Sequence, residues 1–174
     1  MKQLAEAEHR NRLITRGLAR SMIAGAVVVA GYYLLPLDVL KDAPIALSLV
    51  IGLLLLVANV AFQLYRIQLA KYPGIRAMEG LATTIPLFIV LFAASYYVMR
   101  GADASSFNAD LTRTDALYLT VTVFSTVGFG DIAPVSETAR LVVTVQMLLD
   151  LVVLGLGVRL FLGAVKMSQQ RSED

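Results

Sequence analysis

The chain has 174 residues, of which 57% are hydrophobic and only 16% charged, and its mean hydropathy is +0.71. Soluble domains are about 45–50% apolar, so this composition indicates a membrane protein. Cysteine is absent, which excludes disulfides and thiolate metal sites, and the single histidine, His9, lies in a charged segment. The net charge of +2 does not predict a nucleic-acid partner, because the basic residues stand at the ends of apolar runs.

Four apolar segments are long enough to cross a membrane as helices, because about 20 helical residues span a hydrocarbon core about 30 Å thick. In chain order they are residues 18–37, 44–70, 81–99 and 138–165. The first follows a basic stretch, as in a signal peptide, but it is long for one and leads into Pro36 and Asp38 instead of a small-residue cleavage site. We therefore expect an uncleaved first span.

Most lysines and arginines outside the spans fall on one side of the membrane if the N-terminus is cytoplasmic. Because positive charge accumulates in cytoplasmic segments, the sequence predicts a multi-pass protein of the cell membrane with both termini in the cytoplasm. Tyr32, Tyr33, Tyr96 and Tyr97 then fall at the outer ends of the first and third spans. They fit either an interfacial aromatic belt or packing between helices.

The connection between the third and fourth spans is long. It begins with a polar loop, residues 101–110, and continues with an apolar stretch, residues 116–124, which is too short to cross the membrane and predicts a half-helix that enters and returns. The sequence STVGFGD, residues 125–131, follows. Irregular backbone at membrane depth must be buried in protein or line a watery cavity, and Gly128 and Gly130 permit backbone angles that other residues avoid.

STVGFGD resembles the selectivity filter of potassium channels, whose common form is TVGYG. The resemblance covers residues 81–165, about half of the chain. Within them, residues 115–124 have the length and place of the family's pore helix, with Asp115 as its N-terminal acid, and residues 132–140 resemble the link into the inner helix. The resemblance implies that K+ is held by the carbonyls of Thr126, Val127, Gly128 and Phe129 and the hydroxyl of Thr126, with Gly130 completing the filter.

The resemblance also implies supporting roles for Ser125, Asp131, Tyr118 and Thr122, with Asp131 at the outer mouth. Phe129 stands where tyrosine is more frequent, so the hydrogen bond of that hydroxyl to the pore helix is lost. Tyr118 stands where many members have tryptophan, and Thr122 lies behind the filter. Either side chain can form a hydrogen bond near Asp131 or simply pack.

One filter strand cannot surround an ion, and the chain has a single pore loop. We therefore expect a closed ring of four identical chains, so the partners of each chain are K+, the lipid bilayer and three identical subunits, and no cofactor is expected besides K+ in the filter. The predicted fold is an all-α membrane protein with four transmembrane helices, a re-entrant pore helix and a filter loop. Its parts are a cytoplasmic segment 1–17, a helical hairpin 18–70, a pore module 71–165 and a cytoplasmic tail 166–174.

The hairpin lacks the arginine repeat of a voltage sensor, because Arg20 and Arg66 lie at or near the ends of the spans. The candidate control element is the inner helix, where Asp150 falls near the middle of the membrane. If they face the cavity, four Asp150 carboxylates would concentrate cations and make conduction sensitive to pH. Alternatively, Asp150 is buried and hydrogen bonded to Gln146, one turn earlier, or to the pore helix.

Arg159 and Gly155 are further candidates for a role in the cavity or in gating. Arg159 is too far along and around the helix to pair with Asp150 of its own chain. We expect Arg159 to extend to the cytoplasmic interface or to meet Glu79, whereas in the pore it would oppose K+ conduction. Gly155 allows the helix to bend or to pack closely against a neighbour.

Two functions are consistent with these features. The first is a passive potassium-selective channel, and the second is a non-conducting, channel-like membrane scaffold or assembly subunit, with a pore obstructed by Arg159. We expect no enzymatic activity, since the sequence contains no paired nucleophile and base and no cluster of metal ligands.

Overall fold

The part of the protein that the structure describes is mostly helical. The computed structural model describes residues 17–170 except 18, 21, 43–44 and 71–72. These residues form a first helix that includes Met22–Leu34, the 3-10 turn η1 (Leu37–Asp42), α2 (Ile45–Gln68), α3 (Pro73–Ala102), α4 (Arg113–Phe124) and α5 (Glu137–Gln170). The β-structure among these residues is limited to one isolated bridge, between Phe107 and Pro134. The prediction of an all-α protein is confirmed for these residues.

Within the described residues, three helices are long and apolar enough to cross a membrane: Val50–Gln68 in α2, Glu79–Ala102 in α3 and Glu137–Arg159 in α5. They correspond to the second, third and fourth predicted spans. The stretch Met22–Leu34 of the first helix is apolar but shorter, and positions 18 and 21 of the predicted first span lie outside the described residues. The predicted N-terminal segment, except Gly17, and residues 171–174 of the predicted tail also lie outside them.

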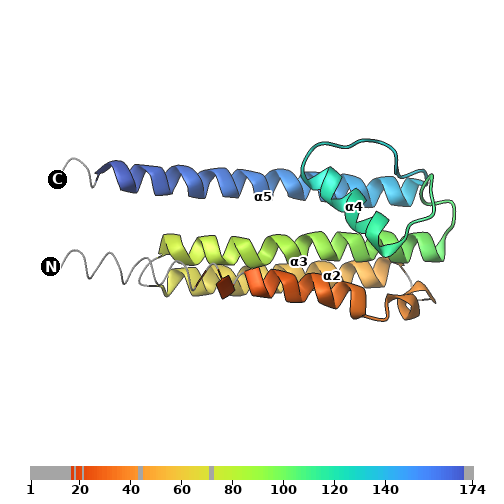
Figure 1. The fold of residues 1–174 in the computed structure, drawn as a ribbon, viewed down its shortest axis with the longest axis horizontal. Coiled ribbons are helices and arrows are strands. Elements are labelled where there is room, and N and C mark those ends of the chain that lie inside the picture. The colour runs from red at the N-terminus through yellow and green to blue at the C-terminus, as the bar shows by residue number, and fades with distance from the viewer. Residues whose placement is uncertain (1–16, 18, 21, 43–44, 71–72, 171–174) are drawn as a thin grey trace.

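The first helix, α2, α3 and α5 lie roughly side by side, and successive long helices run in opposite directions (Figure 1). Polar side chains connect α2 to α3: Asn59 Nδ2 donates to Thr84 Oγ1 at 3.1 Å, and Gln63 Nε2 donates to Thr83 Oγ1 at 2.9 Å. Hydrogen bonds of this kind join helices inside a membrane. The short helix α4 lies at one end of the molecule, where it contacts both α3 and α5 (Figure 1).

Aromatic side chains on α3 form the core beside α4. Phe88, Phe92 and Tyr96 are four residues apart and therefore share one face of the helix, with neighbouring ring centroids 4.9 and 6.3 Å apart. Phe124, at the end of α4, lies 6.0 Å from Phe88, and Phe107 lies 5.7 Å from Tyr96. These contacts fix the C-terminal end of α4. Residues 125–131, called the filter loop below, follow directly after it.

The two faces of α5 differ in exposure. The buried residues share one face of the helix, toward α3 and α4; they are Ala139, Val142, Val143, Gln146 and Asp150. Elsewhere on the helix, large apolar side chains are exposed, among them Leu141, Leu148, Leu151 and Val152. An exposed apolar surface of this kind fits contact with lipid or with another subunit.

Candidate functional site

The helix α4 has a well-defined start. Thr112 Oγ1 accepts a hydrogen bond from the Asp115 backbone N–H at 3.2 Å, and Asp115 Oδ2 accepts one from the Thr112 backbone N–H at 2.9 Å. This reciprocal pair is a capping box, so the prediction of Asp115 as an N-terminal acid is confirmed. The hydrogen bonds from Thr112 favour the charged carboxylate and lower the pKa of Asp115.

The filter backbone alternates in handedness. Thr126, Gly128 and Gly130 have φ angles of +61°, +53° and +77°, whereas Val127 and Phe129 do not have positive φ. A positive φ is an outlier for a β-branched residue such as Thr126, and strain of this kind is typical of functional sites. An added Cβ on Gly128 or Gly130 would meet no atom within 4 Å. Backbone conformation, not lack of space in this chain, is therefore what requires glycine at these two positions.

Hydrogen bonds to α4 orient the filter carbonyls. The N–H groups of Val127 and Gly128 both donate to the Thr122 carbonyl, at 3.0 and 3.1 Å, and the Thr126 N–H donates to the Val123 carbonyl at 2.9 Å. In a trans peptide the C=O of one residue points away from the N–H of the next, and the described chain contains no cis peptide. The carbonyl oxygens of Ser125, Thr126 and Val127 therefore point away from α4. The Thr122 hydroxyl donates to the Leu119 carbonyl of its own helix, whereas the sequence also allowed a hydrogen bond near Asp131.

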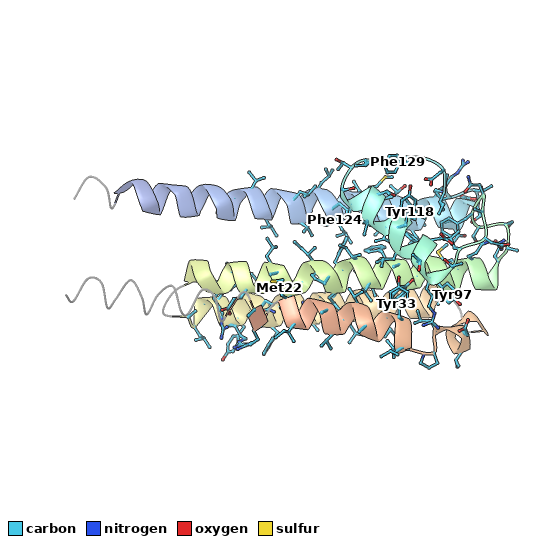
Figure 2. The ribbon with its side chains drawn as sticks, viewed as in Figure 1. Met22, Tyr33, Tyr97, Tyr118, Phe124 and Phe129 are labelled. Atoms are coloured by element: carbon cyan, nitrogen blue, oxygen red, sulfur yellow. The ribbon has the colours of Figure 1, made fainter. Side chains whose placement is uncertain are left out.

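Tyr118 contacts the end of the filter loop that includes Phe129 and Asp131. Its hydroxyl donates to Asp131 Oδ2 at 3.0 Å, and its ring is stacked on that of Phe129, with an interplanar angle of 3° and a centroid separation of 6.3 Å. Figure 2 shows Tyr118 and Phe129 at this end of the molecule. Of the two alternatives for Tyr118, the structure therefore has the hydrogen bond to Asp131, together with a stacking contact.

Asn108 holds the link beyond the filter. Its Nδ2 donates to the Asp131 carbonyl at 3.0 Å, and its Oδ1 accepts from the Ala133 N–H at 2.8 Å. The Asn108 N–H also donates to the Ala133 carbonyl at 3.1 Å. The sequence did not single out Asn108, because one polar residue in a polar loop has no spacing that marks it.

The filter loop is open in the single chain. Residues 125–131 are all exposed, including the large side chains of Val127 and Phe129, at 55% and 70%. Exposure of this much apolar surface near the oriented carbonyls is consistent with a site that several chains complete.

Gln146 is the centre of a buried polar cluster between α3, α4 and α5. Its Oε1 accepts from the Tyr96 hydroxyl at 2.5 Å, and its Nε2 lies 3.2 Å from the Thr120 carbonyl oxygen and 3.3 Å from Asp150 Oδ2. Tyr96 and Gln146 are fully buried, and Asp150 is 2% exposed. In the described part of the chain, Asp150 Oδ1 has no hydrogen-bond partner.

The structure therefore places Asp150 inside the subunit with Gln146 as its partner, the second of the two alternatives. In the single chain, neither side chain is open to a cavity. Tyr96 likewise packs between helices, whereas Tyr33 is 43% exposed. The sequence spacing of Gln146 and Asp150 was sufficient to suggest their contact, but nothing in it linked Tyr96 to them.

Arg159 and Gly155 lie on the exposed part of α5. Glu79 forms an ion pair with Arg76, three residues earlier on α3, so the expected contact of Arg159 with Glu79 stays a prediction. An added Cβ on Gly155 would meet no atom within 4 Å, so packing inside the subunit does not require glycine there.

Comparison with known protein families finds a match in the part of the chain that contains this site. Residues 84–166 match the family model described as "Ion channel". No curated protein and no solved structure matches the chain. The matched residues include most of α3, all of α4, the filter loop and most of α5. This match identifies residues 84–166 as an ion-channel domain and supports the resemblance to the potassium-channel pore-domain family.

Proposed function

We propose that the protein is a potassium-selective channel that conducts K+ passively across the cell membrane. The observation that carries this proposal is the backbone of residues 126–130, in which every second residue has a positive φ. In a strand with only negative φ, successive carbonyls point to opposite sides. Alternating the sign of φ turns them to the same side, and a ring of such oxygens can replace the hydration shell of K+.

The proposed pore contains four identical chains. One strand offers oxygens from one side only, and its exposed position leaves room for three more strands around an axis. A closed cyclic ring uses the same surfaces on every chain, and the exposed apolar side chains of α5 are available for contacts between subunits. In this arrangement, K+ is coordinated by the carbonyls of residues 126–129.

The proposed topology has both termini in the cytoplasm and the filter near the outer face, as the distribution of basic residues favours. Gating would not use the first hairpin as a voltage sensor, because its spans carry no internal run of arginines. Sensitivity of conduction to pH or to cations through Asp150 would act from its buried position, by way of Gln146, rather than from an open cavity.

A flux assay on the purified full chain in liposomes tests the proposal. With K+ inside and a K+-free solution outside, we expect K+ flux at least tenfold faster than Na+ flux measured under a matched Na+ gradient, an order of magnitude that corresponds to about 1.4 kcal/mol of discrimination. Native mass spectrometry should give a complex of four 18.8 kDa chains. Equal K+ and Na+ fluxes would reject selectivity. A tetramer without flux under any tested condition would favour the scaffold function.

A further inference from the structure

Arg113 has a position that α4 alone does not explain. It is the first residue of α4, directly after the N-cap residue Thr112. The N-terminal end of a helix carries partial positive charge, so a cation there is unfavourable for α4 itself. The Arg113 side chain is nevertheless largely buried, at 19% exposure. Its contacts with a different helix account for this arrangement.

The Arg113 guanidinium caps the first helix. Its NH1 donates to the carbonyls of Tyr32, Tyr33 and Leu35, at 3.1, 2.8 and 2.8 Å. The last carbonyls of a helix have no partner within the helix and carry partial negative charge. A guanidinium has several N–H donors for these carbonyls and a positive charge that is favourable next to their partial negative charge. The first helix therefore receives its C-terminal cap from α4, about 80 residues later in the chain.

Further contacts surround the guanidinium. Its NH2 lies 3.2 Å from Asp38 Oδ2 in η1, and its central carbon lies 5.3 Å from the centroid of the Tyr97 ring on α3. The Tyr97 hydroxyl donates to the other oxygen of Asp38 at 2.8 Å. Figure 2 shows Tyr33 and Tyr97 at this end of the helices. Arg113 thus joins the first helix, η1, α3 and α4 at one point.

The first helix also bonds back to α4. The Tyr32 hydroxyl donates to the Arg113 carbonyl at 2.7 Å, and the hydroxyls of Tyr33 and Thr114 are hydrogen bonded at 3.2 Å. The Tyr32 side chain is 1% exposed. Because hydrogen bonds run in both directions, the start of α4 cannot shift relative to the first helix without breaking several of them.

We infer that Arg113 is a positioning residue of the pore, which ties the peripheral hairpin to the start of α4 and thereby helps to hold the filter in its selective geometry. A helix of 12 residues is short and stiff, about 18 Å long. Its far end holds the filter through the Thr122 carbonyl, which accepts from Val127 and Gly128. A displacement at Arg113 is therefore carried to the filter. This inference rests on the proposed potassium-channel function.

The test compares Arg113→Gln and Arg113→Lys with Arg100→Gln in liposomes. Arg100, near the end of α3, is a matched control, because its side chain is buried to a similar extent, at 18% exposure, and is likewise bonded to a backbone carbonyl and to a carboxylate. Its partners among the described residues are Ala109 and Asp110, which lie in the loop after α3 and not in the hairpin. We expect Arg113→Gln to lower the ratio of K+ to Na+ flux by about fivefold or more, within the range for coupling between distant sites. Arg113→Lys should fall between Arg113→Gln and the wild type, since lysine keeps the charge but loses the planar set of donors. Arg100→Gln should keep the wild-type ratio.

A purely structural role gives a different result. It lowers the yield or thermal stability of the tetramer but leaves the flux ratio of the remaining tetramers unchanged, and this outcome would overturn the inference. If Arg113→Gln does not assemble, Tyr32→Phe removes only the hydroxyl that donates to the Arg113 carbonyl and should lower the ratio about twofold. A wild-type ratio in Tyr32→Phe would then overturn it.

Hydrogen exchange separates this inference from the proposed function. If the wild-type protein shows no selective flux, the proposed function fails, but exchange of the Val127 and Gly128 amides still reports whether Arg113 holds α4. Faster exchange at these amides in Arg113→Gln, with no change in Arg100→Gln, would support the tie to the filter loop. Equal exchange in both variants and the wild type would reject it.

Discussion

The hydroxyl of Tyr118 donates a hydrogen bond to Asp131 Oδ2 at 3.0 Å, and this contact joins the middle of α4 to the last residue of the filter loop. The same ring stacks on Phe129, so Tyr118 supports the filter through both a polar and an apolar contact. Phe129 has no hydroxyl, so of these two stacked rings only Tyr118 can form a hydrogen bond.

Tyr118→Phe should weaken the filter without unfolding the protein. The variant keeps the stacked ring and loses a hydrogen bond to a carboxylate, and hydrogen bonds to charged groups are stronger than those between neutral groups. We expect each channel to conduct K+ at the wild-type rate while open but to stay open for a shorter time. The measurement is single-channel open time in planar bilayers. Tyr65→Phe, on the exposed surface of α2, is the control. Equal open times in Tyr118→Phe and the wild type would show that the hydrogen bond contributes nothing to the filter.

Gly128→Ala should abolish selective flux, whereas Gly155→Ala should not. An added Cβ meets no atom within 4 Å at either site, but only Gly128 has a positive φ. A left-handed conformation costs a residue with a side chain roughly 1–2 kcal/mol, and four copies would bear that cost in one pore. The measurement is the ratio of K+ to Na+ flux in liposomes. Selective flux through Gly128→Ala would contradict the proposed role of the alternating backbone.

Thr112→Ala should lower the free energy of unfolding of the pore module by about 1 kcal/mol, because the variant loses the N-cap of α4. The loss is measured from the midpoint of chemical or thermal unfolding. Serine keeps the hydroxyl, so Thr112→Ser is the matched control and should retain most of the stability. A Thr112→Ala protein as stable as the wild type would argue that tertiary contacts alone hold the start of α4.

The contribution of Asp115 should depend on pH. Hydrogen bonds from Thr112 lower its pKa in the folded protein below the ordinary value of 3.8. The stabilisation is therefore present above pH 3.8 and is lost as the pH falls through the folded-state pKa. The difference in unfolding midpoint between the wild type and Asp115→Asn should be constant near neutral pH and should shrink in acid. A difference that grows in acid would contradict this assignment. Because the site is partly exposed, the effect should stay below about 1 kcal/mol.

Asp150→Asn should change conductance or its response to pH while leaving the tetramer intact. Asparagine has nearly the same shape and keeps an oxygen that can accept from Gln146, but it removes a titratable group from the buried cluster. Currents are compared across pH in bilayers, with Met147→Leu, an exposed site on the same helix, as control. Indistinguishable currents from Asp150→Asn and the wild type at every pH would remove Asp150 from the control of conduction.

Local patterns in the sequence predicted much of the fold and the filter. Runs of apolar residues predicted the helices α2, α3 and α5, because a membrane helix is defined by its length and hydropathy, which are local properties. The acid at Asp115 predicted the start of α4, and the glycines predicted a backbone with unusual angles at 128 and 130. Thr126 was expected as a ligand, but its own positive φ was not expected, since β-branched residues rarely adopt that conformation.

The rest depended on contacts between residues far apart in the chain. The sequence by itself determined a helical membrane protein with an ion-channel domain that resembles the potassium-channel pore, because hydropathy and the STVGFGD motif are both read within short segments. Only the tertiary structure decided that Asp150 is buried beside Gln146 and Tyr96, and that Arg113 caps a helix about 80 residues earlier. The direction in which a side chain points, and the helix that it meets there, are set by how the helices pack, and periodicity within one helix does not contain that information.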